Sequence, residues 1–218
     1  MHPLADDLYA IPLMPRYGVN AYLLGDVLVD AGIRQSRRRL ERALAGHRVT
    51  AHALTHVHPD HQGASHALCS AYGWPLWCGA ADASAMETGV TPIPPSLLTH
   101  LLDRVWTGPA HPVARTLAEG DEVGGFDVIE TPGHTSGHLA FWRARDRALV
   151  LGDVLNGMHL VTTWAGLCEP PAALTADPVQ NRASARKLAD LHPRLVCFGH
   201  GPPMRNDGQF EDFVNALA

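Results

Sequence analysis

Short apolar runs separated by turn-forming residues predict β-strands in both halves of the chain. In the first half, residues 17–30 have the pattern of a hairpin that turns at Gly25-Asp26, and residues 49–55 have that of a single strand. In the second half, the same pattern predicts strands at residues 123–130, 138–143, 148–151 and 195–198.

Apolar positions at helical spacing lie between these strands. The predicted helices are residues 34–45, 63–72, 181–191 and 207–217, the second of which ends at Gly73. Strands that alternate with helices and hairpins predict an α/β protein in which two sheets are covered by outer helices. We expect residues 1–218 to form a single domain.

Composition is typical of a globular enzyme. The 218 residues are 46% hydrophobic and 18% charged, which is enough apolar material for a substantial core. The formal net charge is −5, and the one basic cluster, residues 37–39, lies on a predicted helix where a solvated face explains it. A nucleic acid is therefore disfavoured as the substrate, because phosphate binding needs a basic surface.

The chain begins without a signal-like apolar segment, and no apolar run is long enough to span a membrane. The four cysteines are scattered and form no Cys-x-x-Cys pair, which indicates free thiols in a reducing compartment. We therefore expect a cytoplasmic protein that is not associated with a membrane.

The densest group of chemically active side chains follows the strand predicted at residues 49–55. It consists of His56, His58, Asp60 and His61. Imidazole nitrogens suit zinc, iron and copper, and a neighbouring carboxylate adds a negatively charged oxygen ligand. Pro59 is expected to interrupt any helix here, so the group is predicted to lie on a loop.

Three further candidate ligands stand beside glycine near the ends of predicted strands. They are His134, Asp153 and His200. Small neighbours leave room for a side chain to reach an ion. Seven candidate ligands exceed what one metal ion needs, whereas two ions that share a carboxylate would use them all.

The order H-x-H-x-D-H, a later histidine, a Gly-Asp and a Gly-His resembles the metallo-β-lactamase-fold superfamily over nearly the whole chain. The resemblance implies an αββα sandwich of two mixed β-sheets with metals at one edge. It assigns His56, His58 and His134 to a first divalent ion. Asp60, His61 and His200 would hold the second, and Asp153 would bridge the two. Zinc is the favoured metal, with iron or manganese as alternatives.

The resemblance also implies a reaction, in which hydroxide held between two ions attacks a carboxylic ester, thioester or lactone of small size. Asp60 would relay a proton. A bridging Asp153 is typical of the glyoxalase II-like and lactonase-like branches and argues against a true β-lactamase. The stretch after Asp153 lacks the basic residue usual in hydroxyacylglutathione hydrolases, so glutathione thioesters are not favoured.

Other residues are expected to support this site. Asp30 matches an acidic position that supports the metal loop in the family, so the resemblance implies that it holds a metal-binding histidine from behind. His138 is expected to bond within the turn that carries His134. His159 and Trp164 are candidates for the substrate pocket. The proline-rich segment 81–117, with a helical piece at 96–106, is either a solvent-facing connector or an insert that lies over the metals.

Two other classes of function stay open. A persulfide dioxygenase would use a single iron held by His56, His134 and Asp153, and leave the other ligands idle. A metal-stabilised binding module would need only one closed ion. The physiological substrate and the oligomeric state are left open by the sequence.

Overall fold

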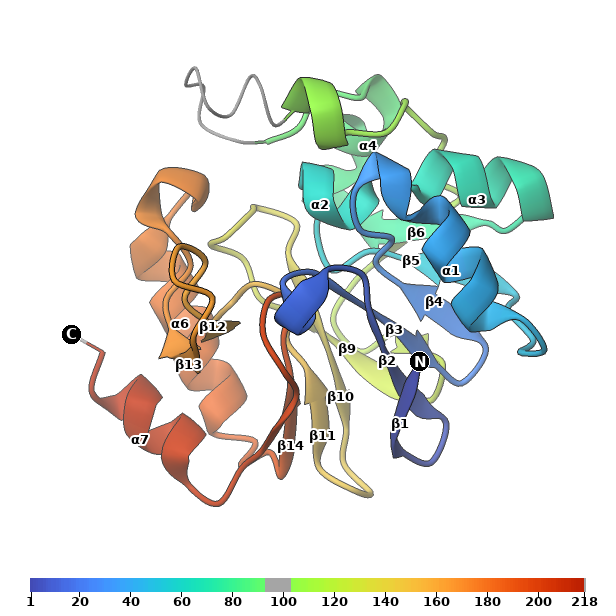
Figure 1. The fold of residues 1–218 in the computed structure, drawn as a ribbon. Coiled ribbons are helices and arrows are strands. Elements are labelled where there is room, and N and C mark those ends of the chain that lie inside the picture. Colours follow the sequence, from blue (N-terminus) through green and yellow to red (C-terminus); the bar gives the residue numbers. More distant parts are fainter. Residues whose placement is uncertain (93–102, 218) are drawn as a thin grey trace.

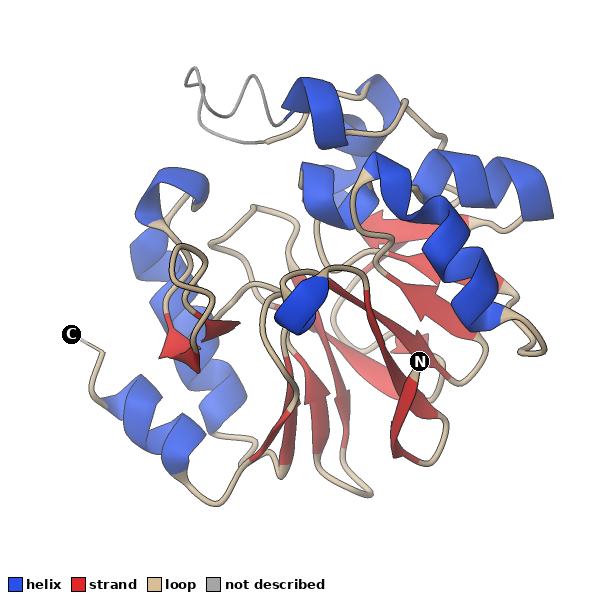
Figure 2. Ribbon diagram, in the orientation of Figure 1, coloured by secondary structure: helices blue, strands red, loops and turns tan. Residues whose placement is uncertain are grey.

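Two β-sheets lie face to face at the centre of the protein, with helices on their outer sides (Figure 2). The computed structural model describes residues 1–92 and 103–217. This is the predicted αββα sandwich. The colours of Figure 1 show that the first half of the chain forms one sheet and the second half forms the other.

The first sheet has seven strands in sequence order. They are β1 (His2–Ala5), β2 (Leu8–Pro12), β3 (Asn20–Leu24), β4 (Val27–Val29), β5 (Ala51–Ala53), β6 (Leu76–Gly79) and β7 (Arg115–Leu117). The pairs up to β3–β4 are antiparallel, and those from β4–β5 onward are parallel. The parallel half places the ends of β4, β5 and β6 at the same edge.

The second sheet has six strands in the order β15-β14-β11-β10-β9-β8. Their bounds are β8 (Glu122–Val123), β9 (Phe126–Glu130), β10 (Leu139–Arg143), β11 (Ala148–Val150), β14 (Leu195–Cys197) and β15 (Met204–Arg205). β11 and β14 are parallel, and the other pairs are antiparallel. A separate two-stranded hairpin, β12 (Asn156–Met158) and β13 (Ala165–Cys168), projects beside this sheet.

The central strands of both sheets are buried on both faces, which explains why they are apolar runs. Tyr22, Leu24 and Val29 of the first sheet meet Phe126, Phe141 and Val150 of the second in one buried cluster between the sheets. The outer face of the first sheet packs on α1 (Arg37–Leu44) and α3 (Ser65–Tyr72). That of the second packs on α6 (Pro178–Ala189) and α7 (Gln209–Asn215).

Several predicted elements differ in extent from those observed. The helix predicted at 34–45 is divided into the 3₁₀ turn η2 (Arg34–Ser36) and α1. The helix predicted at 181–191 begins earlier, at Pro178, because Asp177 caps it by accepting the Gln180 N–H. The predicted stop at Gly73 is confirmed, with a left-handed φ of 69° after α3.

Segment 81–117 is more than a proline-rich insert. It contains α4 (Ala83–Thr88) and β7, so it completes the edge of the first sheet. The helical piece expected at 96–106 lies mostly outside the described residues, but its end, residues 103–106, is helical. Across the described residues, no helix combines the length and apolarity needed to cross a bilayer.

Candidate metal centre

The seven candidate ligands converge from four strand ends. His56 and His58 follow β5, and His134, Asp153 and His200 follow β9, β11 and β14 of the other sheet. The expectation that Pro59 keeps the first group out of any helix is wrong, because Pro59 begins α2 (Pro59–Gln62). Proline fits this first position, since its missing N–H has no partner within the helix anyway. Asp60 and His61 thus lie on a single helical turn.

Three overlapping groups have ligand atoms close enough to hold a cation. The groups are His56 with His58 and His134, His56 with His61 and Asp153, and Asp60 with His61 and His200. In each group the ligand atoms lie within 4.8 Å of one another. Of the seven residues, only Asp60 is partly exposed, and the other six are buried.

Asp153 lies between the groups. Its Oδ1 is 3.5 Å from His61 Nε2, and its Oδ2 is 3.6 Å from His134 Nε2 and 3.0 Å from His200 Nε2. His200 Nε2 is in turn 3.4 Å from Asp60 Oδ2. One carboxylate therefore reaches histidines of both the expected first site and the expected second site.

The donor set fits divalent cations on evidence from the polar atoms themselves. His56 Nε2, His58 Nε2, His61 Nε2 and Asp153 Oδ1 are all buried without a hydrogen-bond partner. Buried polar atoms rarely stay unpaired, so four together at one point indicate a ligand that they share. The fold and these clusters together imply divalent metal ions. Gly199 leaves the space open, because a Cβ there would fall on Asp153 Oδ1.

Burial and charge divide the histidines into two classes. Burial lowers the pKa of His58 to about 4 and lowers the pKa values of His56 and His134 well below the ordinary histidine range, so these rings are neutral. Burial also opposes protonation of His61 and His200, but carboxylates outweigh it. Asp153 and Asp30 raise the pKa of His61 well above its ordinary value, and Asp153 and Asp60 raise the pKa of His200 to about 9.

Four of the five histidines are held by their Nδ1 atoms. His61 Nδ1 donates to Asp30 Oδ2 at 2.9 Å, and His200 Nδ1 donates to the Gly18 carbonyl at 2.6 Å. His134 Nδ1 bonds Thr175 Oγ1 at 3.2 Å, and His56 Nδ1 bonds Thr55 Oγ1 at 3.0 Å. Such partners fix ring orientation and leave Nε2 directed at a metal. His58 differs, because its Nδ1 lies 3.0 Å from His134 Nε2.

Asp30 holds the ligand loop at a second residue, Thr55. Besides His61, it accepts hydrogen bonds from the Thr55 N–H and the Thr55 hydroxyl, at 2.8 and 2.9 Å. Asp30 itself has a positive φ of 59°, which is uncommon for a residue with a side chain. The contact between Asp30 and His61 is the one expected from the sequence.

His138 bonds outside its own turn. Its Nδ1 bonds Thr131 Oγ1 at 2.8 Å, and its Nε2 accepts the Asp153 N–H at 3.1 Å. Burial lowers the pKa of His138 to about 3, which keeps Nε2 free to accept. His138 therefore positions the backbone of Asp153, whereas the sequence suggested bonding only within residues 132–138.

Asp82 was missed in the sequence, although it connects two ligand-bearing loops. Its carboxylate accepts hydrogen bonds from Val57 N–H at 3.1 Å, Thr135 Oγ1 at 2.7 Å and Gly137 N–H at 2.9 Å. The side chain is buried, and burial raises its pKa. One signal could have found it, because Asp82 follows the apolar strand β6 as Asp30 and Asp153 follow theirs.

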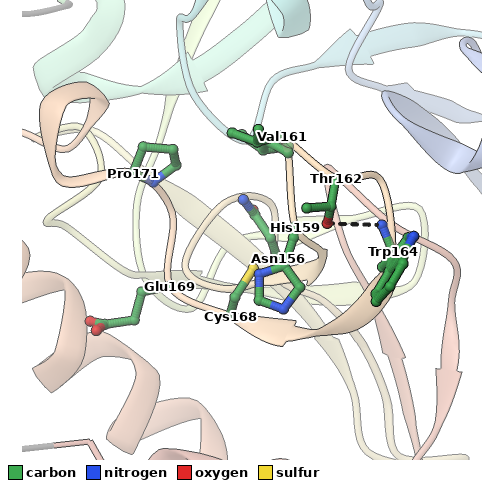
Figure 3. Close-up of a pocket in the computed structure, with 9 residues that line it drawn as sticks. Asn156, His159, Val161, Thr162, Trp164, Cys168, Glu169 and Pro171 are labelled. Atoms are coloured by element: carbon green, nitrogen blue, oxygen red, sulfur yellow. Dashed lines mark hydrogen bonds between the residues drawn. The ribbon is translucent and has the colours of Figure 1, made fainter.

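Two cavities of about 460 Å³ each are lined by residues of the β12–β13 hairpin. The first is drawn in Figure 3 and is lined by Asn156, His159, Leu160, Val161, Thr162, Trp164, Cys168, Glu169 and Pro171. His159 and Trp164 both line it, and the Trp164 side chain, which also lines the second cavity, is 72% exposed. None of the seven candidate ligands lines either cavity.

Comparison with known proteins agrees with this fold and donor set. Residues 14–200 match the family model of the metallo-beta-lactamase superfamily, and the chain belongs to that superfamily. It is 31% identical over 203 residues to the probable metallo-hydrolase YflN of Bacillus subtilis (strain 168), a match that spans 82% of this chain and 76% of YflN. The structure of TTHA1623 in a di-iron-bound form has a TM-score of 0.70 and 30% identity, and the match covers 90% of this chain and 94% of that one.

A second group of relatives is enzymatic by name. The hydroxyacylglutathione hydrolase of Jannaschia sp. (strain CCS1) is 31% identical over 152 residues, which is 67% of this chain but 46% of that enzyme. The chain therefore spans about half or less of the length of the hydroxyacylglutathione hydrolases that it matches. These comparisons support a metal-dependent hydrolase, and they leave its substrate to be assigned.

Proposed function

We propose that this protein is a dinuclear metal-dependent hydrolase of carboxylic esters, thioesters or lactones of small molecules. The central position of Asp153 carries the proposal, because its two oxygens lie 3.5 Å from His61 Nε2 and 3.6 Å from His134 Nε2. A single-ion site would need neither the second oxygen nor the second set of ligands.

The division of ligands follows the clusters. His56, His58 and His134 would hold one ion, Asp60, His61 and His200 would hold the other, and Asp153 would contact both. Two divalent cations held there would supply hydroxide at neutral pH and polarise a carbonyl group. Zinc is the favoured metal, because imidazole and carboxylate ligands suit it. Iron and manganese are the alternatives, and one similar structure contains two irons.

The chain's own residues would then orient the reaction. Asp60 is the only partly exposed member of the set, so its carboxylate lies where solvent and substrate can reach it. It would accept a proton from the attacking water and return it to the leaving oxygen or sulfur. Asp30 and His138 would keep His61 and Asp153 in place through the contacts described above.

The similarity to hydroxyacylglutathione hydrolases favours esters and thioesters as the reaction class. The sequence after Asp153, which lacks a basic residue from Val154 to Trp164, argues against glutathione as the leaving group. A β-lactam is the less favoured substrate, because the bridging carboxylate belongs to the other branches of the resemblance.

The test combines metal analysis with a substrate panel. Purified protein should contain close to two metal ions per chain and should hydrolyse members of a panel of aryl esters, thioesters and lactones. Asp153→Ala should lower the metal content, whereas Asp60→Asn should reduce kcat about 100-fold or more. Two bound ions without hydrolysis of any panel member, β-lactams included, would refute the proposal.

The mononuclear alternative has its own outcome in the same experiment. A single iron per chain that stays single after zinc is supplied, with oxygen consumption on a persulfide substrate, would replace hydrolysis by sulfur oxidation. The paired clusters around Asp153 favour the dinuclear hydrolase over this reading.

A further inference from the structure

Asn156 has an unusual environment for a buried side chain. The residue is fully buried, yet neither Asn156 Nδ2 nor Asn156 Oδ1 has a hydrogen-bond partner. The other buried asparagines are bonded, because Asn20 donates to Phe198 and Gly201 carbonyls and Asn181 donates to the Val154 carbonyl. Among the residues that the structure describes, only Asn156 has both polar atoms buried without a partner. An unpaired amide is costly, so a ligand that binds it would stabilise the site.

The place of Asn156 connects the metal centre to a cavity. It stands three residues after Asp153, on β12, where its backbone pairs with Cys168. Its side chain lines the first cavity, and Figure 3 shows the amide nitrogen directed toward the space near Val161 and Pro171. Pro171 is linked back to the metal centre, since its carbonyl accepts from Thr175 Oγ1, which also bonds His134.

The cavity wall indicates the chemistry of the ligand. Leu160, Val161, Trp164 and Pro171 supply apolar surface, and no lysine or arginine lines the cavity. Among the described residues that line it, Glu169 is the only carboxylate, and its charge is balanced by Arg182 at 2.6 and 3.0 Å, so the wall offers no free charge to an ionic ligand. The cavity therefore suits a neutral ligand that offers both a hydrogen-bond donor and a hydrogen-bond acceptor to Asn156. An amide group does so, and it complements the Nδ2 donor and Oδ1 acceptor of an asparagine.

We propose that Asn156 recognises an amide group of the substrate, so that the preferred ester, thioester or lactone carries an amide and an apolar chain. This inference rests on the proposed hydrolase function and assigns its substrate class. The apolar chain would lie against Val161 and Trp164, whose exposed fractions are 96% and 72%. Covering these side chains would remove apolar surface from water.

The first test compares two thioesters on the metal-loaded protein. One is the S-ethyl thioester of N-hexanoylglycine, and the other is S-ethyl nonanethioate, in which two methylenes replace the amide. For each protein, kcat/KM for the amide thioester is divided by kcat/KM for the nonanethioate. The value for the wild type is then divided by the value for Asn156→Leu. This double ratio cancels the intrinsic reactivity of the two thioesters, and we expect it to be about tenfold or more.

Thr162→Val is the matched control variant. Thr162 lines the same cavity, is exposed and already accepts a hydrogen bond from the Trp164 N–H. Its thioester ratio should stay within about twofold of wild type. An unchanged ratio in Asn156→Leu, with or without a loss of thermal stability, would overturn the inference and indicate that buried water satisfies the amide.

A binding experiment needs neither turnover nor a variant that folds. The chain has five asparagines, so protein labelled with ¹⁵N at asparagine has few side-chain signals. N-ethylhexanamide should shift one of these amide pairs in the metal-loaded wild type, whereas an alkyl ether of the same length should not. If neither thioester is hydrolysed but the shift occurs, the hydrolase proposal fails for thioesters and amide recognition stands. If no pair shifts at saturating probe, amide recognition fails.

Discussion

Hydrogen bonds from outside the ligand set determine how the metal-binding side chains are held. The Asp82 carboxylate receives two backbone N–H groups and one hydroxyl, from the loop that carries His58 and the loop that carries His134. These loops belong to different sheets, so Asp82 fixes the separation between ligands that no strand pairing connects.

Asp82→Ala should therefore loosen both loops at once. Three donors would lose their acceptor in a buried place, and we expect a loss of about 2–4 kcal/mol in the free energy of unfolding. Metal content should fall in the same variant. Chemical denaturation and metal analysis measure the two effects, with Asp127→Ala on an exposed position of β9 as the control. Full metal content with wild-type stability in Asp82→Ala would contradict this role.

Gly199 presents a different constraint. A Cβ at this position would collide with Asp153 Oδ1 and approach His61 Cε1 at 2.7 Å. We expect Gly199→Ala to displace the bridging carboxylate and to lower metal content to one ion or fewer per chain while the sheets still form. Gly120→Ala is the comparison, since a Cβ there meets nothing within 4 Å and only its φ of 88° is unfavourable. Equal metal content in the two variants would show that the site tolerates the methyl group.

The β12–β13 hairpin contributes to the walls of both cavities and carries exposed apolar residues at its turn. It is anchored to the opposite loop by Arg16 Nη1, which donates to Thr163 Oγ1 at 2.9 Å. Arg16 and Tyr17 both have positive φ angles, of 56° and 61°. Such strained backbone is frequent at ligand sites. Arg16 and Tyr17 line the second cavity together with Thr163 and Trp164 of the hairpin.

Trp164→Ala should separate binding from stability. Because 72% of Trp164 is exposed, its removal should change the free energy of unfolding by less than about 1 kcal/mol. The kcat/KM value should fall severalfold for long-chain acyl thioesters and little for acetyl thioesters. A uniform fall across chain lengths would contradict a role in holding the apolar chain. Leu217→Ala, far along the chain on the C-terminal segment, offers a control for general effects of apolar truncation.

The sequence was most informative where elements are buried on both faces. β10 and β11 were predicted because every residue in them is buried and apolar runs mark them clearly. β1 and β7 were missed, since both lie at sheet edges with exposed residues and β1 contains a proline. Hairpin β12–β13 was missed because Gly157 and the exposed residues 165–166 interrupt any strand pattern.

The candidate ligands could be predicted because their residue types identify them, whereas the contacts of Asp82 and Thr175 could not. Asp82 contacts Gly137 across 55 positions, and Thr175 contacts His134 across 41. The position of Asp82 after an apolar strand marks it as a candidate, but nothing local in the sequence identifies the distant loop that it bonds. Asp30 was found only because a family resemblance supplied its place. The roles of all seven ligands remain predictions until metals are measured.

The whole molecule is joined at the metal centre, since each sheet contributes ligands from its strand ends. His56, His58, Asp60 and His61 follow a strand of the first sheet, and the other three follow strands of the second. Metal ions should therefore hold the two sheets together in addition to their chemical role.

Removal of metal should lower the melting temperature. Ions present at 100 times their Kd contribute about 2.7 kcal/mol, which corresponds to about 5–10 °C for a chain of this size. Calorimetry before and after chelation, followed by zinc addition, measures the loss and its recovery. A His56→Ala/His134→Ala double variant should show a smaller change on chelation, because only the Asp60, His61 and His200 group remains to hold an ion. Identical melting curves for wild type with and without chelator would contradict a cross-link between sheets.

Proton release should accompany metal binding and give it a pH dependence of known sign. Asp153 and Asp60 raise the pKa of His200 to about 9, so at pH 7 this ring carries a proton that a metal must displace. His61 is raised in the same direction by Asp153 and Asp30. Since each displaced proton contributes a factor of about ten per pH unit, apparent zinc affinity should rise between pH 6.5 and 9, and the contribution of His200 should level off above pH 9. In the metal-free protein, the free energy of unfolding depends on pH in the opposite direction. The pair of His200 and Asp153 stabilises the fold fully below pH 6.5, and this stabilisation is lost as pH rises through 9. Chelator-competition titrations across this range measure the slope of apparent zinc affinity against pH. The slope should be smaller in Asp30→Asn, which removes one carboxylate that raises the pKa of His61. A zinc affinity that does not depend on pH would contradict the displacement of these protons.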